Sequence, residues 1–174
     1  MVTATNLIVG ARDLTVDSVN IGALVGGVEV LYESEKFLHR VDQHMGVLAI
    51  DKIDETVRVR VRMGESTLEN LRIAMGQPSW ALSQATSLLH IGSETNVPQH
   101  ALVITGKAPG ATDKTRTITI PKAVVEEGGT HSYTKDGRTE YEVTFMCLVN
   151  SSLDAGWQIM TIQDSAGKFA FSTS

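Results

Sequence analysis

The 174-residue sequence has one cysteine, no long apolar run and only a small excess of negative charge. The single cysteine, Cys147, cannot form a disulfide within the chain, and its apolar neighbours indicate a small core residue. No apolar run approaches the roughly 20 residues that a membrane span requires. The first ten residues also lack the basic start and the apolar core of a secretory leader. We therefore expect a protein that is made and folded in a cytoplasm and has no membrane partner.

The motifs of metal sites and common catalytic centres are also missing. The segment GKAPGATDK at residues 106–114 resembles a phosphate loop, but it lacks the Gly-Lys-Ser/Thr ending and precedes a strand. No GxSxG elbow occurs. No HExxH motif or other ligand spacing involves the five histidines, which are His39, His44, His90, His100 and His131. These absences predict a protein that is not an enzyme and uses no metal or cofactor.

The length and the net charge of the chain limit the number of domains and the kinds of partner that it can bind. A chain of 174 residues with 42% hydrophobic residues is typical of a single globular domain, here predicted for residues 1–174. The net charge of −5 argues against a dedicated binder of DNA or anionic membranes, which needs a concentrated cationic surface. The same net charge is compatible with a surface along which DNA passes without being bound.

The most regular part of the sequence is residues 56–76, TVRVRVRMGESTLENLRIAMG. Its first half has the period-two alternation of a strand with one apolar face and one polar face. The apolar positions are Val57, Val59, Val61 and Met63, and the polar positions are Arg58, Arg60 and Arg62. Such an arginine row is more typical of a solvated or edge-protecting strand face than of a row that binds phosphate.

The second half of this segment predicts a flanking helix within residues 65–76. Ser66 and Glu69 have the spacing of a capping box, Gly76 stands where a left-handed C-cap is expected, and Pro78 forbids continuation. One face is apolar and is expected to pack on a sheet. Its residues are Leu68, Leu71, Ala74 and Met75, of which Leu68, Leu71 and Met75 are the predicted packing residues.

Shorter alternating runs predict about eight strands, and hence an antiparallel sandwich or barrel-like fold with one flanking helix. The Asp136-Gly137 pair, between residues 130–135 and 138–148, is typical of a hairpin turn. Pro121 indicates that the strand at 115–120 ends there or lies at an edge. The other predicted strands lie at 28–32, 37–41, 101–105 and 157–162, with a short one near Leu88.

Three stretches fit this scheme less directly. Residues 1–20 have no lasting periodicity and are interpreted as an N-terminal arm with one short strand. Residues 79–98 are predicted to be an irregular excursion. Residues 42–54 are interpreted either as a long loop that exposes apolar side chains or as a hairpin arm packed within the fold.

The order of these elements resembles the major tail tube protein of long-tailed phages. In that family a strand carrying V-D-Q precedes a strand that runs into T-L-E-N-L and a glycine, as FLHRVDQHMG and TVRVRVRMGESTLENLRIAMG do here. The C-terminal half is also similar, through HALVITGKAPGATDKTRTITIPKAVV, a K-D-G hairpin and VTFMCLVNSS. The resemblance covers roughly residues 22–150, and the TLENL helix is its most specific part.

The resemblance implies a structural protein of the virion tail, assembled in the host cytoplasm. In this family a β-sandwich subunit with a flanking helix forms homohexameric rings, which stack through a long loop and terminal arms into a tube that delivers DNA. The related tubes of contractile tails and the haemolysin-coregulated ring protein of type VI secretion share the fold. The implied partners are the protein itself and the tape measure, tail terminator and tail-tip proteins, while double-stranded DNA passes without specific binding.

These expectations assign residues to three assembly roles: ring closure, lining of the lumen and contact between rings. Ring closure is predicted to use strand pairing at open edges, with 57–63 and 115–120 as candidates. The lumen is expected to be acidic or neutral, because a cationic wall would hold DNA phosphates. The predicted inter-ring loop residues are Met45, Val47, Leu48 and Ile50. The lumen candidates are Glu29, Glu33, Glu140 and Glu142.

Two alternative functions remain at this stage. The first is a small-molecule-binding β-barrel, which would keep its ligand in an interior pocket and stay monomeric. The second is another virion part of the same fold, such as a tail terminator or an adaptor at the end of the tube. The mass of the purified protein separates the first alternative from a tube protein, and the copy number per particle separates the second.

Overall fold

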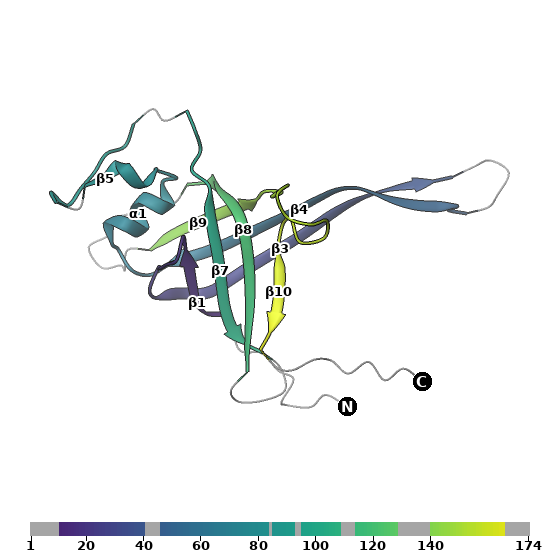
Figure 1. Cartoon of the computed structure of the whole chain (residues 1–174), viewed down its shortest axis with the longest axis horizontal. Helices are drawn as coiled ribbons and strands as arrows, with labels where there is room; N and C mark the ends of the chain where they lie inside the picture. Colours follow the sequence, from purple (N-terminus) through teal and green to yellow (C-terminus); the bar gives the residue numbers. More distant parts are fainter. Residues whose placement is uncertain are drawn as a thin grey trace.

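The computed structural model describes residues 11–40, 46–83, 85–92, 95–108, 114–128 and 140–165. This part of the chain is mostly antiparallel β-structure with one α-helix, which confirms the predicted fold class (Figure 1). The elements are β1 (Ala11–Val16), β2 (Val19–Asn20), β3 (Leu24–His39), β4 (Ala49–Met63), α1 (Leu68–Ala74), a 3-10 turn (Ser79–Ala81), β5 (Leu82–Ser83), β6 (Leu88–Leu89), β7 (His100–Lys107), β8 (Thr115–Glu127), β9 (Tyr141–Cys147) and β10 (Thr161–Asp164).

Among the described residues, one eight-stranded sheet contains every strand except β5 and β6, which pair with each other. Its order is β2-β1-β7-β8-β9-β4-β3, and β10 pairs with β8. The long strand β8 pairs with β10 over residues 116–119 and with β9 over residues 123–127. In Figure 1 the strands β7, β8 and β10 cross over β3 and β4, so the sheet folds over itself and encloses a core.

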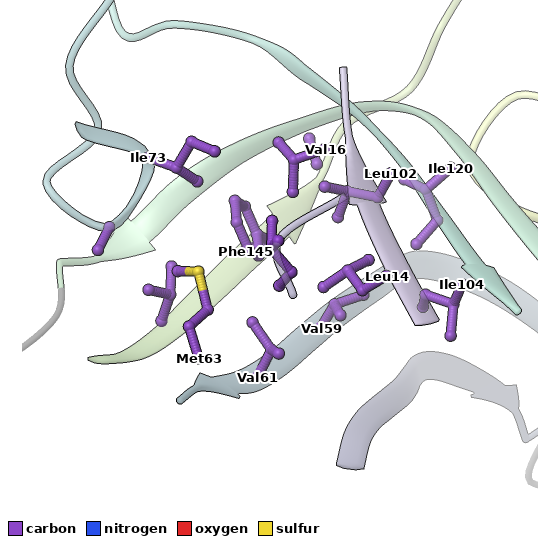
Figure 2. Close-up of a cluster of buried hydrophobic side chains, with 14 of the residues drawn as sticks. Leu14, Val16, Val59, Val61, Met63, Ile73, Leu102, Ile104, Ile120 and Phe145 are labelled. Carbon is purple, nitrogen blue, oxygen red and sulfur yellow. The ribbon is translucent and has the colours of Figure 1, made fainter. Parts of the chain in front are cut away.

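The core lies between the two crossing parts of the sheet. Val57, Val59, Val61 and Met63 are at most 2% exposed, which confirms the predicted apolar face of this strand. Figure 2 shows the side chains from β4 and β9 facing those from β1, β7 and β8. Cys147 is buried as predicted, and this burial raises the pKa of its thiol to about 11.

The prediction that a strand ends at Pro121 is wrong, because β8 continues through this residue to Glu127. The register with β7 shifts between the pairs His100–Ala123 and Leu102–Ile120. Pro121 therefore sits in a bulge, where a missing backbone N–H costs no ladder hydrogen bond. A proline is compatible with a bulge or with a strand end, and the register with β7, which the local sequence does not contain, decides between the two.

Helix α1 is shorter than predicted and has a different N-cap. Its cap is Thr67, whose hydroxyl accepts a hydrogen bond from the backbone N–H of Asn70 at 3.1 Å. The Ser66 hydroxyl instead lies 2.6 Å from the hydroxyl of Tyr141, and Glu69 forms an ion pair with Arg72. The capping box predicted from Ser66 and Glu69 is therefore wrong.

The C-terminus of α1 agrees with the prediction. Gly76 has a φ of +60°, and its N–H donates to the carbonyl of Ile73 at 2.9 Å. The N–H of Gln77 donates to the carbonyl of Arg72 at 3.0 Å, which completes a Schellman motif.

The buried face of α1 is rotated relative to the predicted one. Ile73 and Ala74 are buried in the core, Leu71 packs against it, and Met75 is half-buried, but Leu68 is exposed. Asn70 takes the inward position near the helix start, and its side-chain amide donates to the carbonyls of Ile21 and Glu65, at 2.9 Å each. These hydrogen bonds satisfy a buried polar group, which hydrophobic periodicity does not anticipate. Leu68 is accordingly not a core-packing residue.

The N-terminal arm predicted for residues 1–20 is corrected in its second half. Residues 11–20 form β1 and β2, and β1 pairs with β7. Leu14 and Val16 are fully buried in the core. Residues 1–10 lie outside the described part of the chain.

The other predicted strands agree with the structure in part. Residues 28–32 and 37–39 belong to the single strand β3, and the short strand near Leu88 is β6. The last strand, β10, begins at Thr161 instead of residue 157. The Asp136-Gly137 hairpin, together with residues 130–135, lies outside the described residues.

Candidate assembly surfaces

The β3–β4 hairpin extends beyond the core as a two-stranded arm, defined here as residues 32–40 and 46–55 (Figure 1). Cross-strand pairs continue along it as far as His39 and Ala49, and the N–H of Leu48 donates to the carbonyl of His39 at 2.8 Å. The long loop predicted for residues 42–54 is therefore corrected, because residues 49–54 belong to β4. Met45 lies outside the described residues.

The arm exposes an unusual number of large apolar side chains. Seven of them are between 43% and 64% exposed, and three of these, Val47, Leu48 and Ile50, are predicted inter-ring residues. The arm thus combines the hairpin of one interpretation with the exposed apolar residues of the other. The full set is Tyr32, Phe37, Leu38, Val47, Leu48, Ile50 and Ile53.

Both faces of the arm carry apolar groups. Leu38 and Ile50 are a direct cross-strand pair and share one face. Phe37 and His39 lie on the other face, where their rings meet edge to face with centroids 4.9 Å apart. His39 Nε2 is also 2.7 Å from a carboxylate oxygen of Asp51. An exposed two-stranded ribbon is marginally stable in water, so a surface that covered these faces would stabilise it.

Polar contacts fix the base of the arm. The Lys52 ammonium donates to the hydroxyl of Tyr32 at 3.0 Å and forms an ion pair with Glu55. The hydrogen bond from Lys52 lowers the pKa of the Glu55 carboxyl, and the same bond raises the pKa of Lys52. Ile53 is the extra residue of a bulge at this point. A surface groove of about 570 Å³ separates the arm base from the segment that includes Val149 and residues 156–160.

Four of the residues that line the arm were missed by the sequence analysis: Tyr32, Phe37, Leu38 and Ile53. The available signal was the Phe37-Leu38 pair, because antiparallel pairing of β3 with β4 places it opposite residues 50–51. Treating residues 37–41 as a separate strand concealed this pairing.

A second surface is an ion-pair ladder formed by residues of β3, β4, β8 and β9. Arg58 pairs with Glu126 at 2.7 Å and with Glu33 at 3.0 Å. The other pairs are Arg62–Glu142 at 3.1 Å, Arg60–Glu29 at 3.7 Å and Arg60–Glu142 at 3.8 Å. The arginine row predicted from sequence is thus solvated and interleaved with carboxylates.

Three of the four predicted lumen residues, Glu29, Glu33 and Glu142, belong to this ladder. Glu140 lies immediately before β9 and is half-buried. With Glu126 the ladder holds four glutamates and three arginines, so its formal charge is one unit negative. Exposed ion pairs contribute only about 0–1 kcal/mol each, so the ladder matters more as a charge pattern than as a source of stability.

The open sheet edge differs from the predicted ones. Residues 57–63 of β4 lie between β3 and β9, and residues 116–119 of β8 lie between β7 and β10. Neither is an edge, so this prediction is wrong. Among the described strands of the large sheet, β2, β3 and β10 each have a hydrogen-bonded neighbour on one side only, and β3 is the longest of the three, so it leaves the longest edge available.

Within the described residues, no group of three or more His, Cys, Asp or Glu side chains is placed to hold a metal ion. The same part of the chain has no helix with the length and apolar character of a membrane span. His100 is buried, and its Nδ1 lies 2.6 Å from a carboxylate oxygen of Asp17, which joins the β1–β2 turn to β7.

No protein-family model matches the chain, and no curated protein gives a significant match.

Proposed function

We propose that this chain is a tail tube subunit, which forms rings that stack into a tube for the delivery of phage DNA. The observation that supports this most strongly is the arm. It projects from a domain whose own core is packed, and its apolar side chains are exposed on both faces. Contiguous apolar surface of this kind is typical of a protein interface.

In this proposal the arm supplies the energy of ring stacking. Each Å² of apolar surface removed from water contributes about 25 cal/mol, and the contact is repeated once per subunit around the ring. Ordering of side chains and loss of rigid-body freedom offset part of this gain.

The free edge of β3 is the proposed element of ring closure. A strand edge that pairs with a neighbouring copy makes a head-to-tail contact, which closes into a ring when the rotation between copies allows it. The hexameric number is an expectation from the family resemblance.

Electron microscopy of the purified protein tests the proposal directly. Rings or tubes should appear as the concentration increases. Compact monomers at high concentration, with and without tail-assembly partners, would contradict it.

We also propose that the ion-pair ladder faces the lumen. Its small negative charge would repel DNA phosphates weakly. A surface of this charge would not displace the counterions of the DNA, so it would lack the free-energy gain by which a cationic surface binds DNA. An assembled tube in which this face is buried between subunits, or lines an otherwise basic channel, would contradict this assignment.

The ligand-barrel alternative requires an interior pocket, but side chains fill the space between the crossing parts of the sheet. Leu14, Val59, Leu102 and Phe145 are all fully buried there (Figure 2). A tail terminator or an adaptor of the same fold would also use the arm. The copy number per particle distinguishes these from a tube subunit, since the tube needs many rings.

A further inference from the structure

A second apolar surface follows helix α1. Residues 77–92 contain no lysine, arginine, aspartate or glutamate, and this segment includes the 3-10 turn, β5 and β6. Three of its large apolar side chains are exposed: Trp80 is 71% exposed, Ile91 is 63% exposed, and Leu88 is 49% exposed. We call these three residues the 79–91 surface.

The arm and the 79–91 surface lie at opposite ends of the molecule. Figure 1 is drawn with the longest axis horizontal, and β5 lies at one end while the β3–β4 arm projects from the other. Two different patches at opposite ends suit a head-to-tail contact, in which each copy offers its arm to the next copy. Such a contact adds subunits along one direction, as a stack of rings requires.

The two patches are also chemically matched. Residues 46–50 of the arm, GVLAI, carry no charge, and neither do residues 77–92. A contact between these two stretches would bury apolar side chains from both partners. Of the charged residues of the arm, Arg40 and Asp51 flank the tip, while Lys52 and Glu55 lie farther back toward its base.

A third group of exposed apolar residues, near β10, is a less suitable partner for the tip. It includes Val149 and Trp157, and its segment borders the groove at the base of the arm. It therefore lies on the arm's own side of the domain. A copy displaced along the long axis would meet the tip with its 79–91 surface instead.

We propose that the arm tip of one subunit docks on the 79–91 surface of a subunit in the next ring. This inference rests on the proposed function, because it requires that subunits stack.

Cross-linking between two variants tests the contact. Chains with Leu48→Cys and chains with Ile91→Cys are mixed, allowed to assemble, and treated with a short bis-maleimide. Each thiol adds across a maleimide double bond, forming a carbon–sulfur bond while a proton goes to the adjacent carbon, so no oxidant is needed. Native Cys147 should stay unmodified, because it is buried and the pKa of its thiol is about 11. The matched control replaces Ile91→Cys by Val149→Cys, a residue that is also more than half exposed.

The expected result is a covalent dimer in the Leu48/Ile91 mixture that exceeds any product of the Leu48/Val149 mixture. In parallel, the double variant Trp80→Ser, Ile91→Ser should lose tubes but keep rings, while Trp157→Ser should still form tubes. Equal or greater cross-linking at Val149, or unimpaired tubes from the Trp80/Ile91 variant, would overturn the docking site and leave the proposed function standing. Unmodified protein that stays monomeric would overturn both.

Discussion

The two halves of strand β4 differ in what covers them. In the half from Val57 to Met63, every second side chain enters the core, and the arginines between them face solvent. In the half from Ala49 to Glu55, all seven residues are exposed, including Ile50 and Ile53. Both halves pair with β3 in one antiparallel ladder. The pairing is therefore continuous while the burial is not.

This contrast separates residues that stabilise the subunit from residues available to a partner. The core half has strict alternation, which is typical of a strand with one covered face. The arm half, AIDKIDE, has no such alternation, and the arm as a whole has apolar groups on both faces. Substitutions in the first half should act on folding, and those in the second on assembly.

The largest effect on folding is expected for Met63→Ala. Met63 is fully buried, so its truncation should lower the free energy of unfolding by about 2–5 kcal/mol through lost burial and the remaining cavity. The matched change Ile50→Ala, in a side chain that is 58% exposed, should alter it by no more than about 0.5 kcal/mol. Urea denaturation of dilute, monomeric protein measures both. Equal losses would show that the arm belongs to the folding unit.

The second-largest effect is expected in the reactivity of thiols, which should differ between the core and the arm. Burial raises the pKa of Cys147 to about 11, whereas a cysteine introduced by Leu48→Cys should keep a value near the ordinary 9.0. Because the thiolate is the reactive form, maleimide should modify the arm on the order of 100-fold faster near neutral pH. The Cys147 rate should keep rising with pH toward 11, while the arm rate levels off near 9. Similar rates at both positions would contradict the packed core around β9.

Substitutions on the polar face of the core half, where the ion-pair ladder lies, should affect stability much less than Met63→Ala on its buried face. Replacing Glu29 and Glu142 by Gln removes exposed ion pairs, so it should lower the free energy of unfolding by only about 0–1 kcal/mol per pair. It also changes the ladder from a small negative to a small positive charge. If this face lines the lumen, assembled tubes should then retain DNA in a salt-dependent way. Unchanged DNA passage would argue against the lumen assignment and leave the fold unaffected.

The smallest effect concerns the ion pair at the arm base. The hydrogen bond from Lys52 lowers the pKa of Glu55, so this pair supports the arm above the ordinary glutamate pKa and is lost as pH falls through the lowered value. Nuclear magnetic resonance titration of the Glu55 carboxyl should detect this, and Lys52→Met should raise its pKa toward 4.5. The same titration curve in both proteins would show that the pair does not form in solution.

The sequence predicted what depends on local pattern and missed what depends on distant partners. The period-two alternation at 57–63 predicts a strand, and Gly76, which can adopt a positive φ, predicts the helix end. The helix face was predicted incorrectly because Asn70 binds the carbonyls of Ile21 and Glu65, one of which is 49 residues away. The bulge at Pro121 depends in the same way on the register with β7.

The assembly surfaces show the same division. Val47, Leu48 and Ile50 stood out as apolar residues in an apparent loop, and their exposure agrees with one of the two interpretations of residues 42–54. Phe37 and Leu38 did not stand out, because only the β3–β4 register brings them beside Ile50 and Asp51. The free edge of β3 was missed for a related reason, since alternation reveals a strand but not how many neighbours it has.

The most direct test of the account is the triple variant Val47→Ser, Leu48→Ser, Ile50→Ser. Circular dichroism and thermal melting should match the native subunit, because these side chains are exposed and the core is unchanged. Electron microscopy should show rings that no longer grow into tubes. A variant that fails to fold would place this segment in the core of the subunit, and a variant that forms tubes as well as the native protein would show that the arm does not hold the rings together.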